Sequence, residues 1–458
     1  MKEIDGKTKV LGVIGNPIEH TLSPVIHNSL CRILGINAVY VPIHVENNIG
    51  SAVKGLCAAK VAGLNITVPY KQEVMENLVE IDPLAQRIGA VNTLVPHEGG
   101  YKGYNTDMPG LKRALESKGI SLAGRKAIVI GAGGASRAVC IMLMDNGVDE
   151  IYLLNRSLDK AQAIAAEIPC VKALGLDEYD KIPFYNADEK NSRYIMFQCT
   201  SLGLKPGDKL AIEDDAFYRL ADYGYDLIYN PANTPFINKL KSMNISCDNG
   251  LSMLLYQGLI AFEYWFDIKI SQEVSQKVYD ILRRKLYGDN IVLVGYMGSG
   301  KTSVGKELSE KYNMNFVDTD EYIVKTQAKS INKIFEESGE AGFRKIESDS
   351  IASLSGLCNT VISTGGGAVI SSENREMLKK LGRVVYLKAD TETIFNRVRH
   401  DDQRPLLKSE SEEELKNRIE NMLSVRRAYY ETAAHKVVVT DNRAILDIVE
   451  EIAEELSE

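Results

Sequence analysis

Strand-like and helical patterns alternate from the start of the chain. The segments 9–14, 38–45 and 63–68 are short and mostly apolar, and segment 50–59 has the spacing of a helix. Short apolar runs that alternate with helical patterns are typical of βαβ units. The pattern therefore predicts an α/β fold built on a largely parallel sheet.

The alternation begins again twice, near residues 125 and 291. The second series has strand-like runs at 126–130, 150–154, 194–199 and 225–229, and it closes with helical patterns at 251–266 and 271–286. A new strand at 291–294 opens a third α/β series. At roughly 150 residues per domain, the length of 458 residues agrees with three units. We expect them at 1–110 (completed by helices at about 245–287), at 111–244 and at 289–458.

Composition and charge narrow the range of partners. The net charge of -8 disfavours nucleic acid and anionic membrane surfaces as the main partner. The first residues lack the long apolar stretch of a signal peptide, and no segment has the ~20 apolar residues that span a bilayer. The seven cysteines form no C-x-x-C pair and the six histidines form no zinc-binding motif, as expected of a reduced cytosolic protein. We therefore expect a cytoplasmic protein that acts on small molecules, and the one assembly we consider is a homodimer.

The glycine loop after strand 291–294 is predicted to bind a nucleotide. The segment G-Y-M-G-S-G-K-T, residues 295–302, fits the P-loop pattern between a strand and a helix. Its glycines let backbone N–H groups converge on phosphate oxygens, and the helix N-terminus adds a positive dipole end. Lys301 would reach the β- and γ-phosphates, and Thr302 would ligate Mg²⁺. The predicted phosphate-binding residues are Gly298, Ser299, Gly300, Lys301, Thr302 and Ser303.

The groups that would select the phosphate acceptor follow along the third series. F-V-D-T-D places Asp318 and Asp320 at the end of a strand, where alternate residues point the same way. Both carboxylates can then face the phosphate loop. One would belong to the metal site and the other would take a proton from the attacking hydroxyl. The further candidates, in chain order, are Arg344, Gly365, Gly366, Gly367, Arg404 and Arg426.

Taken in this order, the third series resembles shikimate kinase. The P-loop, D-T-D, F-R-x-x-E, T-G-G-G, R-P-L-L and R-x-x-x-Y segments carry the resemblance over about 170 residues. It implies that Asp320 activates the 3-hydroxyl of shikimate, that Asp318 and Thr302 hold Mg²⁺, and that Arg404 lies on a lid. Shikimate would be held by Asp320, Arg344, Gly365, Gly366, Gly367 and Arg426, while Arg397 and Arg443 resemble adenine-contacting positions. Ala428 departs from the proline that many members carry.

The earlier glycine loop is predicted to bind a dinucleotide. It follows strand 126–130 and begins a helix inside a βαβ unit. In this context the pattern G-x-G-x-x-[GAS] is stronger evidence for a dinucleotide site than it is alone. NAD sites tend to have Asp or Glu at the end of the next strand, but this chain has Asn155 followed by Arg156. No carboxylate would repel a 2′-phosphate there and Arg156 can bind it, so NADP is favoured over NAD. The predicted cofactor-binding residues are Gly131, Ala132, Gly133, Gly134, Ala135, Asn155, Arg156, Ser157 and Lys160.

A set of polar residues in the first series would bind the substrate. Hydroxyl and amide side chains suit a polyhydroxylated carboxylate, and a lysine beside an aspartate is a plausible proton donor when hydride is transferred to a ketone. Lys71 and Asp107 are the candidates for that pair. The other candidates are Thr21, Ser23, Asn65, Thr67 and Asn92, and the same residue types also occur as helix caps and turn residues.

As a set, residues 5 to about 287 resemble shikimate dehydrogenase. The resemblance implies a substrate-binding domain at 1–110 and a Rossmann NADP-binding domain at 111–244. It makes Lys71 and Asp107 the catalytic pair, and Thr21 and Ser23 the carboxylate ligands. The remaining substrate contacts would be Thr67, Asn92, Tyr229 and Gln257. Thr21 replaces a more usual serine. The hydroxyl group is kept, but the added methyl group leaves open whether the site accepts quinate.

The leading hypothesis is a bifunctional enzyme of the shikimate pathway, which serves chorismate and aromatic amino acid biosynthesis. It would reduce 3-dehydroshikimate with NADPH and then phosphorylate shikimate with ATP and Mg²⁺. One alternative is a quinate/shikimate dehydrogenase fused to a small-molecule kinase of different specificity, which the D-T-D and T-G-G-G segments disfavour. Another is a ligand-sensing protein without activity, which the presence of Lys71, Asp107, Lys301 and Asp320 disfavours.

Overall fold

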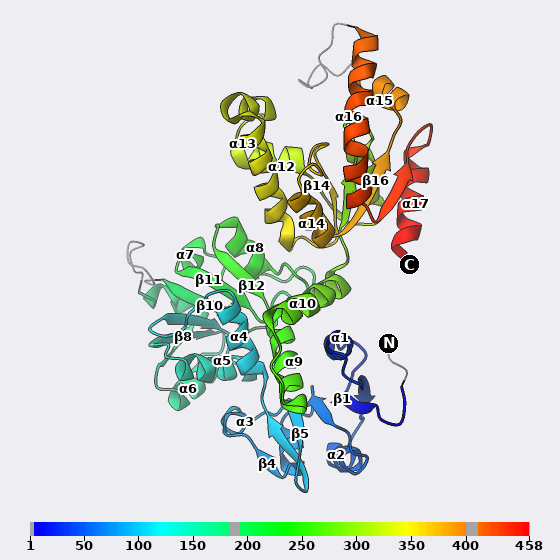
Figure 1. Ribbon diagram of the computed structural model, residues 1–458. Helices are drawn as coiled ribbons and strands as arrows, with labels where there is room; N and C mark the ends of the chain where they lie inside the picture. The colour runs from blue at the N-terminus through cyan, green and yellow to red at the C-terminus, as the bar shows by residue number, and fades with distance from the viewer. Residues whose placement is uncertain (1–3, 184–192, 400–410, 458) are drawn as a thin grey trace. The chain divides into compact units, whose positions relative to one another are not determined.

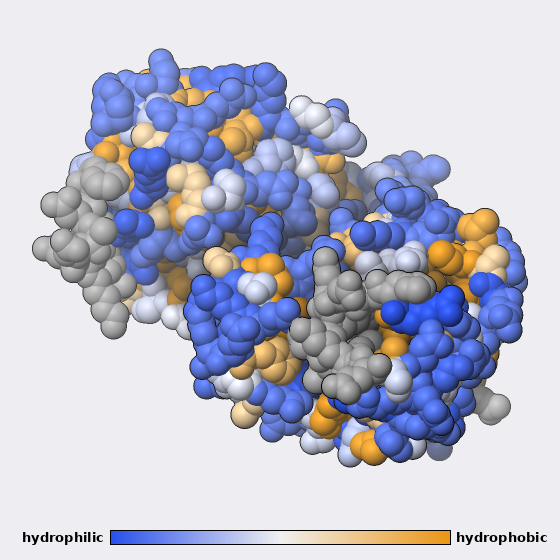
Figure 2. Space-filling view, turned by 90° about the horizontal axis from the view of Figure 1, so that it is seen from above, coloured by the Kyte–Doolittle hydropathy of each residue, from blue (hydrophilic) through white to orange (hydrophobic). Residues whose placement is uncertain are grey.

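The computed structural model describes residues 4–183, 193–399 and 411–457, arranged in two compact units, Met1–Leu286 and Tyr287–Glu458 (Figure 1). Each unit is built from parallel strands and covering helices, so the expected α/β class is confirmed. Hydrophilic residues cover most of the face seen in Figure 2. In the described part of the chain, none of the helices has the length and apolarity that crossing a bilayer requires.

The first sheet has six strands in the order β2-β1-β3-β5-β6-β4. Their bounds are β1 Lys9–Gly15, β2 Ala38–His44, β3 Gly63–Ile66, β4 Glu80–Ile81, β5 Thr93–His97 and β6 Gly100–Tyr104. β1 runs parallel to β2 and β3, as the alternating pattern predicts. β5 is antiparallel to β3 and to β6, and this hairpin was not predicted. It turns at Gly99, whose φ of 80° suits glycine.

Short helices connect these strands. They are α1 Ser23–Leu34, α2 Ile49–Ala58, the 3-10 helix η1 Glu73–Asn77 and α3 Pro83–Ile88. Pro24 stands in the first turn of α1, where a missing N–H costs nothing. Gly35 ends the same helix with a φ of 68°.

The second sheet is a doubly wound parallel sheet in the order β12-β11-β10-β7-β8-β9. Its strands are β7 Lys126–Ile130, β8 Glu150–Asn155, β9 Val171–Gly175, β10 Tyr194–Gln198, β11 Ala221–Asp226 and β12 Ser246–Asn249. The covering elements are α5 Gly134–Asp145, α6 Leu158–Glu167, η2 Leu176–Lys181, α7 Asp215–Tyr218 and α8 Pro235–Ser242. The strand order reverses between β7 and β10, and dinucleotides bind at such a reversal.

Three further helices complete the first unit: α4 Asp107–Ser117, α9 Leu251–Phe266 and α10 Gln272–Tyr287. α4 begins three residues after β6 and packs along α9 (Figure 1). The two helices approach closely at Gly110, because a Cβ atom there would lie 2.7 Å from the backbone nitrogen of Gln257. Glycine at this position therefore lets α9 bring Gln257 beside the start of α4.

The second unit contains a five-stranded parallel sheet in the order β14-β15-β13-β16-β17. Its strands are β13 Ile291–Val294, β14 Asn315–Asp318, β15 Thr360–Ser363, β16 Arg383–Lys388 and β17 Lys436–Val439. Its helices are α11 Lys301–Lys311, α12 Thr319–Gln327, α13 Ile331–Ser353, η3 Leu354–Gly356, α14 Ser372–Leu381, α15 Thr391–Val398, α16 Glu412–Ala433 and α17 Ile445–Ser457. Apolar clusters fill both faces, one around Val292 and Val294 and one around Ile291 and Leu293.

Candidate active sites

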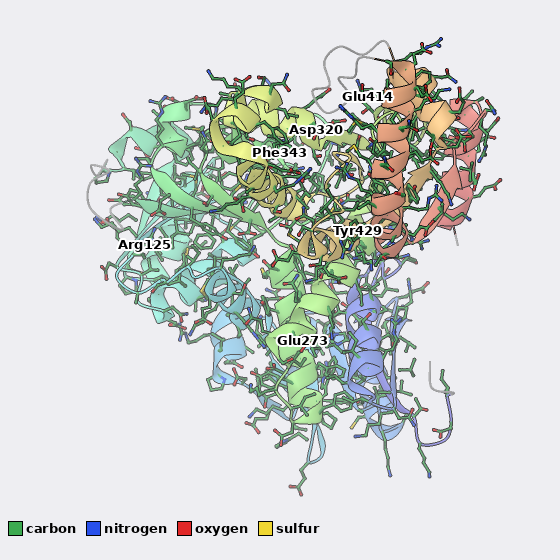
Figure 3. All side chains as sticks on the ribbon, turned by 45° about the horizontal axis from the view of Figure 1, so that its top comes forward. Arg125, Glu273, Asp320, Phe343, Glu414 and Tyr429 are labelled. Carbon is green, nitrogen blue, oxygen red and sulfur yellow. The ribbon has the colours of Figure 1, made fainter. Side chains whose placement is uncertain are left out.

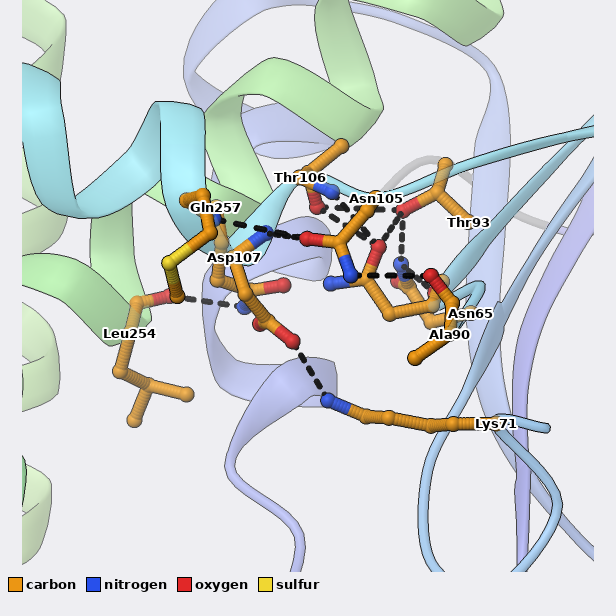
Figure 4. A network of polar contacts seen from close by, with 11 residues as sticks. Asn65, Lys71, Ala90, Thr93, Asn105, Thr106, Asp107, Leu254 and Gln257 are labelled. Atoms are coloured by element: carbon orange, nitrogen blue, oxygen red, sulfur yellow. Dashed lines mark hydrogen bonds and ion pairs between the residues drawn. The ribbon is translucent and has the colours of Figure 1, made fainter. Parts of the chain in front are cut away.

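Lys71 and Asp107 form an ion pair in the first unit. The Lys71 Nζ lies 2.6 Å from Asp107 Oδ2, although the residues are 36 positions apart in the chain (Figure 4). Their side chains are 32% and 22% exposed, so a substrate or a water molecule can reach them. Lys71 lies in a turn beyond the end of β3, and Asp107 is the first residue of α4. The folded chain thus brings together the two residues predicted as the catalytic pair.

The backbone around this pair is held by a short network. Asn105 Oδ1 accepts a hydrogen bond from the Asp107 N–H at 3.1 Å, and its amide nitrogen donates to the Ala90 carbonyl at 3.0 Å (Figure 4). The Val91 N–H donates to the carbonyl of Lys71 at 2.8 Å. Segment 89–92 therefore fixes the backbone on both sides of the pair.

Asn65 and Asn92 have different environments, although both were predicted to bind substrate. The Asn65 amide nitrogen donates to the Asn92 carbonyl and to Thr93 Oγ1, both at 3.1 Å, and Asn65 Oδ1 accepts from Tyr40 Oη at 2.7 Å. This amide therefore ties β3 to β5. Asn92 Oδ1 is likewise occupied, by the Thr106 N–H at 2.8 Å. However, the Asn92 amide nitrogen donates to no other described residue, so it has hydrogen atoms to offer a substrate.

The other predicted substrate ligands lie on several elements and are partly exposed. Ser23 begins α1, and its N–H donates to Thr21 Oγ1 at 3.3 Å. Gln257 is seen beside Asp107 in Figure 4, with its amide nitrogen 2.8 Å from the Leu254 carbonyl. Tyr229 was expected within a strand, but β11 ends at Asp226 and Tyr229 lies in the following loop. Partial burial raises the pKa of Tyr229.

Asp226 supports that loop and was missed by sequence reasoning. Its carboxylate is fully buried and accepts hydrogen bonds from Thr234 Oγ1 at 2.6 Å and from the Ile228 N–H at 3.0 Å. Burial raises the pKa of Asp226 to about 6, while the hydrogen bonds oppose the rise. An aspartate at the end of an apolar run gave no signal of this role.

The first glycine loop leaves open space at its centre. Gly131 has a φ of 105°, and a Cβ atom there would lie 2.9 Å from Thr200 Cγ2. At Gly133 and Gly134 a Cβ atom would meet nothing within 4 Å. α5 begins at Gly134, so the N–H groups of its first turn are available beside this space. A pyrophosphate fits such a position, because both the free N–H groups and the helix dipole favour an anion.

The end of β8 carries positive charge without an acidic partner. Asn155 closes the strand, with its amide nitrogen 2.9 Å from the Ser157 carbonyl. Arg156 and Lys160 are exposed, and neither makes an ion pair with any residue that the structure describes. These groups fit the 2′-phosphate of NADP rather than the bare ribose hydroxyls of NAD.

The second glycine loop wraps around a buried lysine. Lys301 is 8% exposed, and its Nζ donates to the carbonyls of Gly295 at 2.8 Å and Tyr296 at 3.0 Å. Gly298 and Gly300 have φ values of 80° and 98°, which suit glycine alone among common residues. The loop therefore holds Lys301 at the position from which a P-loop lysine reaches phosphate oxygens.

Thr302 and Asp318, predicted as the metal ligands, lie together. Thr302 Oγ1 donates to Asp318 Oδ2 at 3.0 Å. A hydroxyl and a carboxylate are hard oxygen donors that fit Mg²⁺, which commonly takes few protein ligands and completes its shell with water and phosphate. Among the described residues, no group of three or more His, Cys, Asp or Glu side chains is arranged to hold a metal on its own.

Asp320 does not lie in a strand as expected. β14 ends at Asp318, whose Oδ1 caps the next helix by accepting from the Asp320 N–H at 3.0 Å. Asp320 therefore belongs to the first turn of α12, beside α13, which carries Phe343 (Figure 3). The capping preference of Asp318 ends the strand two residues earlier than alternation predicts.

The T-G-G-G segment lies against Asp320 and Arg344. A Cβ atom at Gly365 would come within 2.7 Å of Asp320 Oδ1, and one at Gly367 would collide with the Arg344 guanidinium. At Gly366 a Cβ atom would be 3.2 Å from the backbone nitrogen of Met297 in the P-loop. The glycines therefore let the predicted acceptor-binding side chains and the phosphate loop approach one another.

Glu347 is a further residue of this site that sequence reasoning did not single out. It is buried, and its Oε2 lies 2.8 Å from Arg344 Nη1. Burial raises the pKa of Glu347, and the charge of Arg344 opposes the rise. The F-R-x-x-E spacing was the available signal, because residues three apart on a helix face the same way. Glu347 thus orients the guanidinium of Arg344.

The remaining arginines differ in how the structure places them. Arg426 lies 5.9 Å from the centre of the Tyr296 ring, next to the P-loop. Arg397 Nη1 donates to the carbonyl of Gly298 in the P-loop at 3.2 Å, which suits a residue near the nucleotide. Arg443 instead binds Glu451 at 2.5 Å and the Asp447 carbonyl at 3.1 Å, both on α17. Arg404 lies outside the described residues.

Comparisons with protein families match the segments that carry these two sites. The models that match are Shikimate dehydrogenase substrate binding domain (residues 13–94), Shikimate / quinate 5-dehydrogenase (113–186), Shikimate 5'-dehydrogenase C-terminal domain (250–274) and Shikimate kinase (297–457). The NADP(+)-dependent shikimate dehydrogenase of Caldanaerobacter subterraneus subsp. tengcongensis is 41% identical over 264 residues, which are 57% of this chain and 93% of the relative. The chain belongs to the shikimate dehydrogenase family. It also carries a shikimate kinase domain, so both expected enzyme types are confirmed in one polypeptide.

Solved structures agree with the dehydrogenase part of the fusion. Shikimate dehydrogenase from Aquifex aeolicus is 34% identical with a TM-score of 0.53, over 60% of this chain and 99% of that one. A chorismate mutase/shikimate 5-dehydrogenase fusion protein from Clostridium acetobutylicum is 32% identical with a TM-score of 0.55, over 61% of this chain and 98% of that one. The same dehydrogenase fold therefore also occurs joined to a different partner enzyme.

Proposed function

We propose that this protein catalyses two consecutive steps of the shikimate pathway, in the cytoplasm and toward chorismate and the aromatic amino acids. 3-Dehydroshikimate is reduced to shikimate, and shikimate is then phosphorylated on its 3-hydroxyl. The observation that carries the proposal is the presence, in one chain, of the Lys71–Asp107 pair and of the Asp320–Arg344 cluster beside a P-loop. The product of the first reaction is the substrate of the second.

In the dehydrogenase site, Lys71 acts as the proton donor. Bound NADPH supplies the hydride to the substrate ketone. As the carbonyl oxygen gains negative charge, the Lys71 ammonium donates a proton to it and becomes a neutral amine. Asp107, 2.6 Å away, holds Nζ in place. The 32% exposure of Lys71 lets solvent return the proton after turnover.

In the kinase site, Asp320 takes the proton from the 3-hydroxyl of shikimate. Arg344, oriented by Glu347, and Arg426 bind the acceptor. Phosphoryl transfer spreads negative charge over the moving phosphate, and Lys301 lies in the loop that offsets it. Thr302 and Asp318 would hold Mg²⁺, which neutralises phosphate charge when bound. Arg404 remains the predicted lid residue.

Arg156→Ala tests the choice of NADP. The side chain is exposed and unpaired within the described structure, so its loss removes a 2′-phosphate ligand without leaving a buried charge. We expect the KM for NADPH to rise about tenfold or more, in line with the loss of one charge-assisted contact. The KM for NADH should change less than twofold, within the roughly ±0.5 kcal/mol of an ordinary surface substitution. Equal effects on both dinucleotides would mean that Arg156 does not bind the phosphate.

Gly367→Ala tests the acceptor site of the kinase. The added methyl group collides with the Arg344 guanidinium and displaces it from the position that Glu347 sets. We expect kcat/KM for shikimate phosphorylation to fall about a hundredfold, because a displaced contact loses both binding and orientation. The matched control is Gly356→Ala, where a Cβ atom has open space and kinase activity should be retained. Normal kinetics in Gly367→Ala would place shikimate elsewhere.

A further inference from the structure

Arg137 connects the dinucleotide-binding helix to the segment behind the catalytic pair. It lies in the first turns of α5, and its Nη1 donates to the carbonyls of Arg87 at 3.1 Å and Ile88 at 3.0 Å, at the end of α3 (Figure 1). Its Nε donates to Glu167 Oε2 at 2.7 Å. One guanidinium thus joins a helix of the second sheet to a helix of the first.

The end of α3 is well suited to this contact. The last carbonyls of a helix lack partners within the helix, and they form the negative end of its dipole. Gly89, with a φ of 72°, turns the chain away and leaves the carbonyls of Arg87 and Ile88 accessible. A planar guanidinium can serve both carbonyls from Nη1 and the carboxylate from Nε, whereas a lysine has a single nitrogen for all its hydrogen bonds.

Segment 89–92 carries the contact to the catalytic residues. It follows α3 directly, and its Ala90 carbonyl binds Asn105, which in turn holds the Asp107 N–H. The Val91 N–H binds the Lys71 carbonyl at 2.8 Å. Movement of the end of α3 is therefore transmitted to both members of the catalytic pair within a few covalent and hydrogen bonds.

The other end of the connection is the open glycine loop. Gly133 and Gly134 face free space immediately before Arg137, and the Arg137 N–H donates to the Gly133 carbonyl at 3.0 Å. A dinucleotide that orders this loop also orders the base of the Arg137 side chain. The far end of α5 is tied to α3 separately, by Arg87 and Asp145 at 2.9 Å. The packing of α3 on α5 therefore does not depend on Arg137 alone.

We propose that Arg137 is a positioning residue that couples dinucleotide binding at the glycine loop to the placement of Lys71 and Asp107. The inference rests on the proposed function of these two sites. It predicts that dinucleotide and substrate strengthen each other's binding through Arg137. By thermodynamic linkage, either ligand can report the coupling.

The test measures NADPH binding to the full chain by fluorescence, with and without saturating shikimate, a pair that cannot react. The dinucleotide side is chosen because shikimate also binds the proposed kinase site. In the wild type, we expect shikimate to lower the Kd of NADPH about fivefold or more, the usual lower range of such coupling. In Arg137→Met, the ratio of the two Kd values should fall to nearly 1. In Glu167→Gln, which keeps the bonds to α3, the ratio should remain.

Each other outcome contradicts a defined part of the account. A ratio kept in Arg137→Met, whether or not NADPH alone binds more weakly, overturns the coupling role. A wild-type ratio of 1, with both ligands bound, does the same. Failure of the wild type to bind NADPH overturns the proposed dehydrogenase site as well. If Arg137→Met does not bind NADPH at all, Arg137→Lys is tested in its place under the same criteria. Lysine keeps the positive charge but lacks the separate nitrogen atoms with which the guanidinium binds α3 and Glu167.

Discussion

Lys71→Ala is expected to abolish reduction of 3-dehydroshikimate and to leave phosphorylation of shikimate unchanged. Lys71 is paired with Asp107 at 2.6 Å, and the structure places it in a different unit from the P-loop. Loss of a general acid costs about 10² to 10⁴ in rate. We therefore expect kcat for NADPH oxidation to fall about a thousandfold, with an unchanged rate of ADP formation from ATP and shikimate.

The matched control for this variant is Lys102→Ala. Lys102 lies on β6 of the same sheet and forms an ion pair with Glu80 at 2.7 Å, but it has no part in the proposed site. Dehydrogenase activity should persist in that variant. Loss of both activities in Lys71→Ala would refute the independence of the two sites, and retained reduction would remove Lys71 from the mechanism.

Asp320→Asn is expected to give the opposite result. An amide cannot accept the proton of the 3-hydroxyl, so kcat of the kinase should fall about a thousandfold. Reduction of 3-dehydroshikimate should continue at the wild-type rate. The control is Glu321→Gln, which removes an exposed carboxylate from the same first turn of α12. A kinase that remained active without Asp320, or lost activity without Glu321, would contradict the assigned base.

The sequence predicted the parallel parts of the fold because the evidence for them is local. The apolar runs at 126–130 and 291–294 coincide with β7 and the core of the third sheet. The β5–β6 hairpin was missed because its strands mix polar and apolar residues and are short. Asp320 is helical because Asp318 caps the helix with a single hydrogen bond of 3.0 Å. The alternation of side chains along a strand cannot predict such a bond.

The motifs predicted which residues lie close together, but they did not predict the hydrogen-bond partners of each side chain. Lys71 and Asp107 were expected together, and they are. The sequence predicts Asn65 as a substrate ligand, yet its side-chain amide forms hydrogen bonds with Thr93 and Tyr40. These partners come from distant segments, so the sequence pattern around Asn65 could not indicate them. The contact of Arg137 with α3 gave no signal, because its acceptors there are backbone carbonyls, which every residue possesses.

The most direct test of the central claim is a single reaction with purified full-length protein, 3-dehydroshikimate, NADPH, ATP and Mg²⁺. NADPH oxidation, ADP formation and the phosphorylated product are measured together, with no other enzyme present. The account predicts one NADPH oxidised and one ADP formed for each shikimate 3-phosphate produced. Accumulation of shikimate without a phosphorylated product, or phosphorylation without NADPH oxidation, would contradict it.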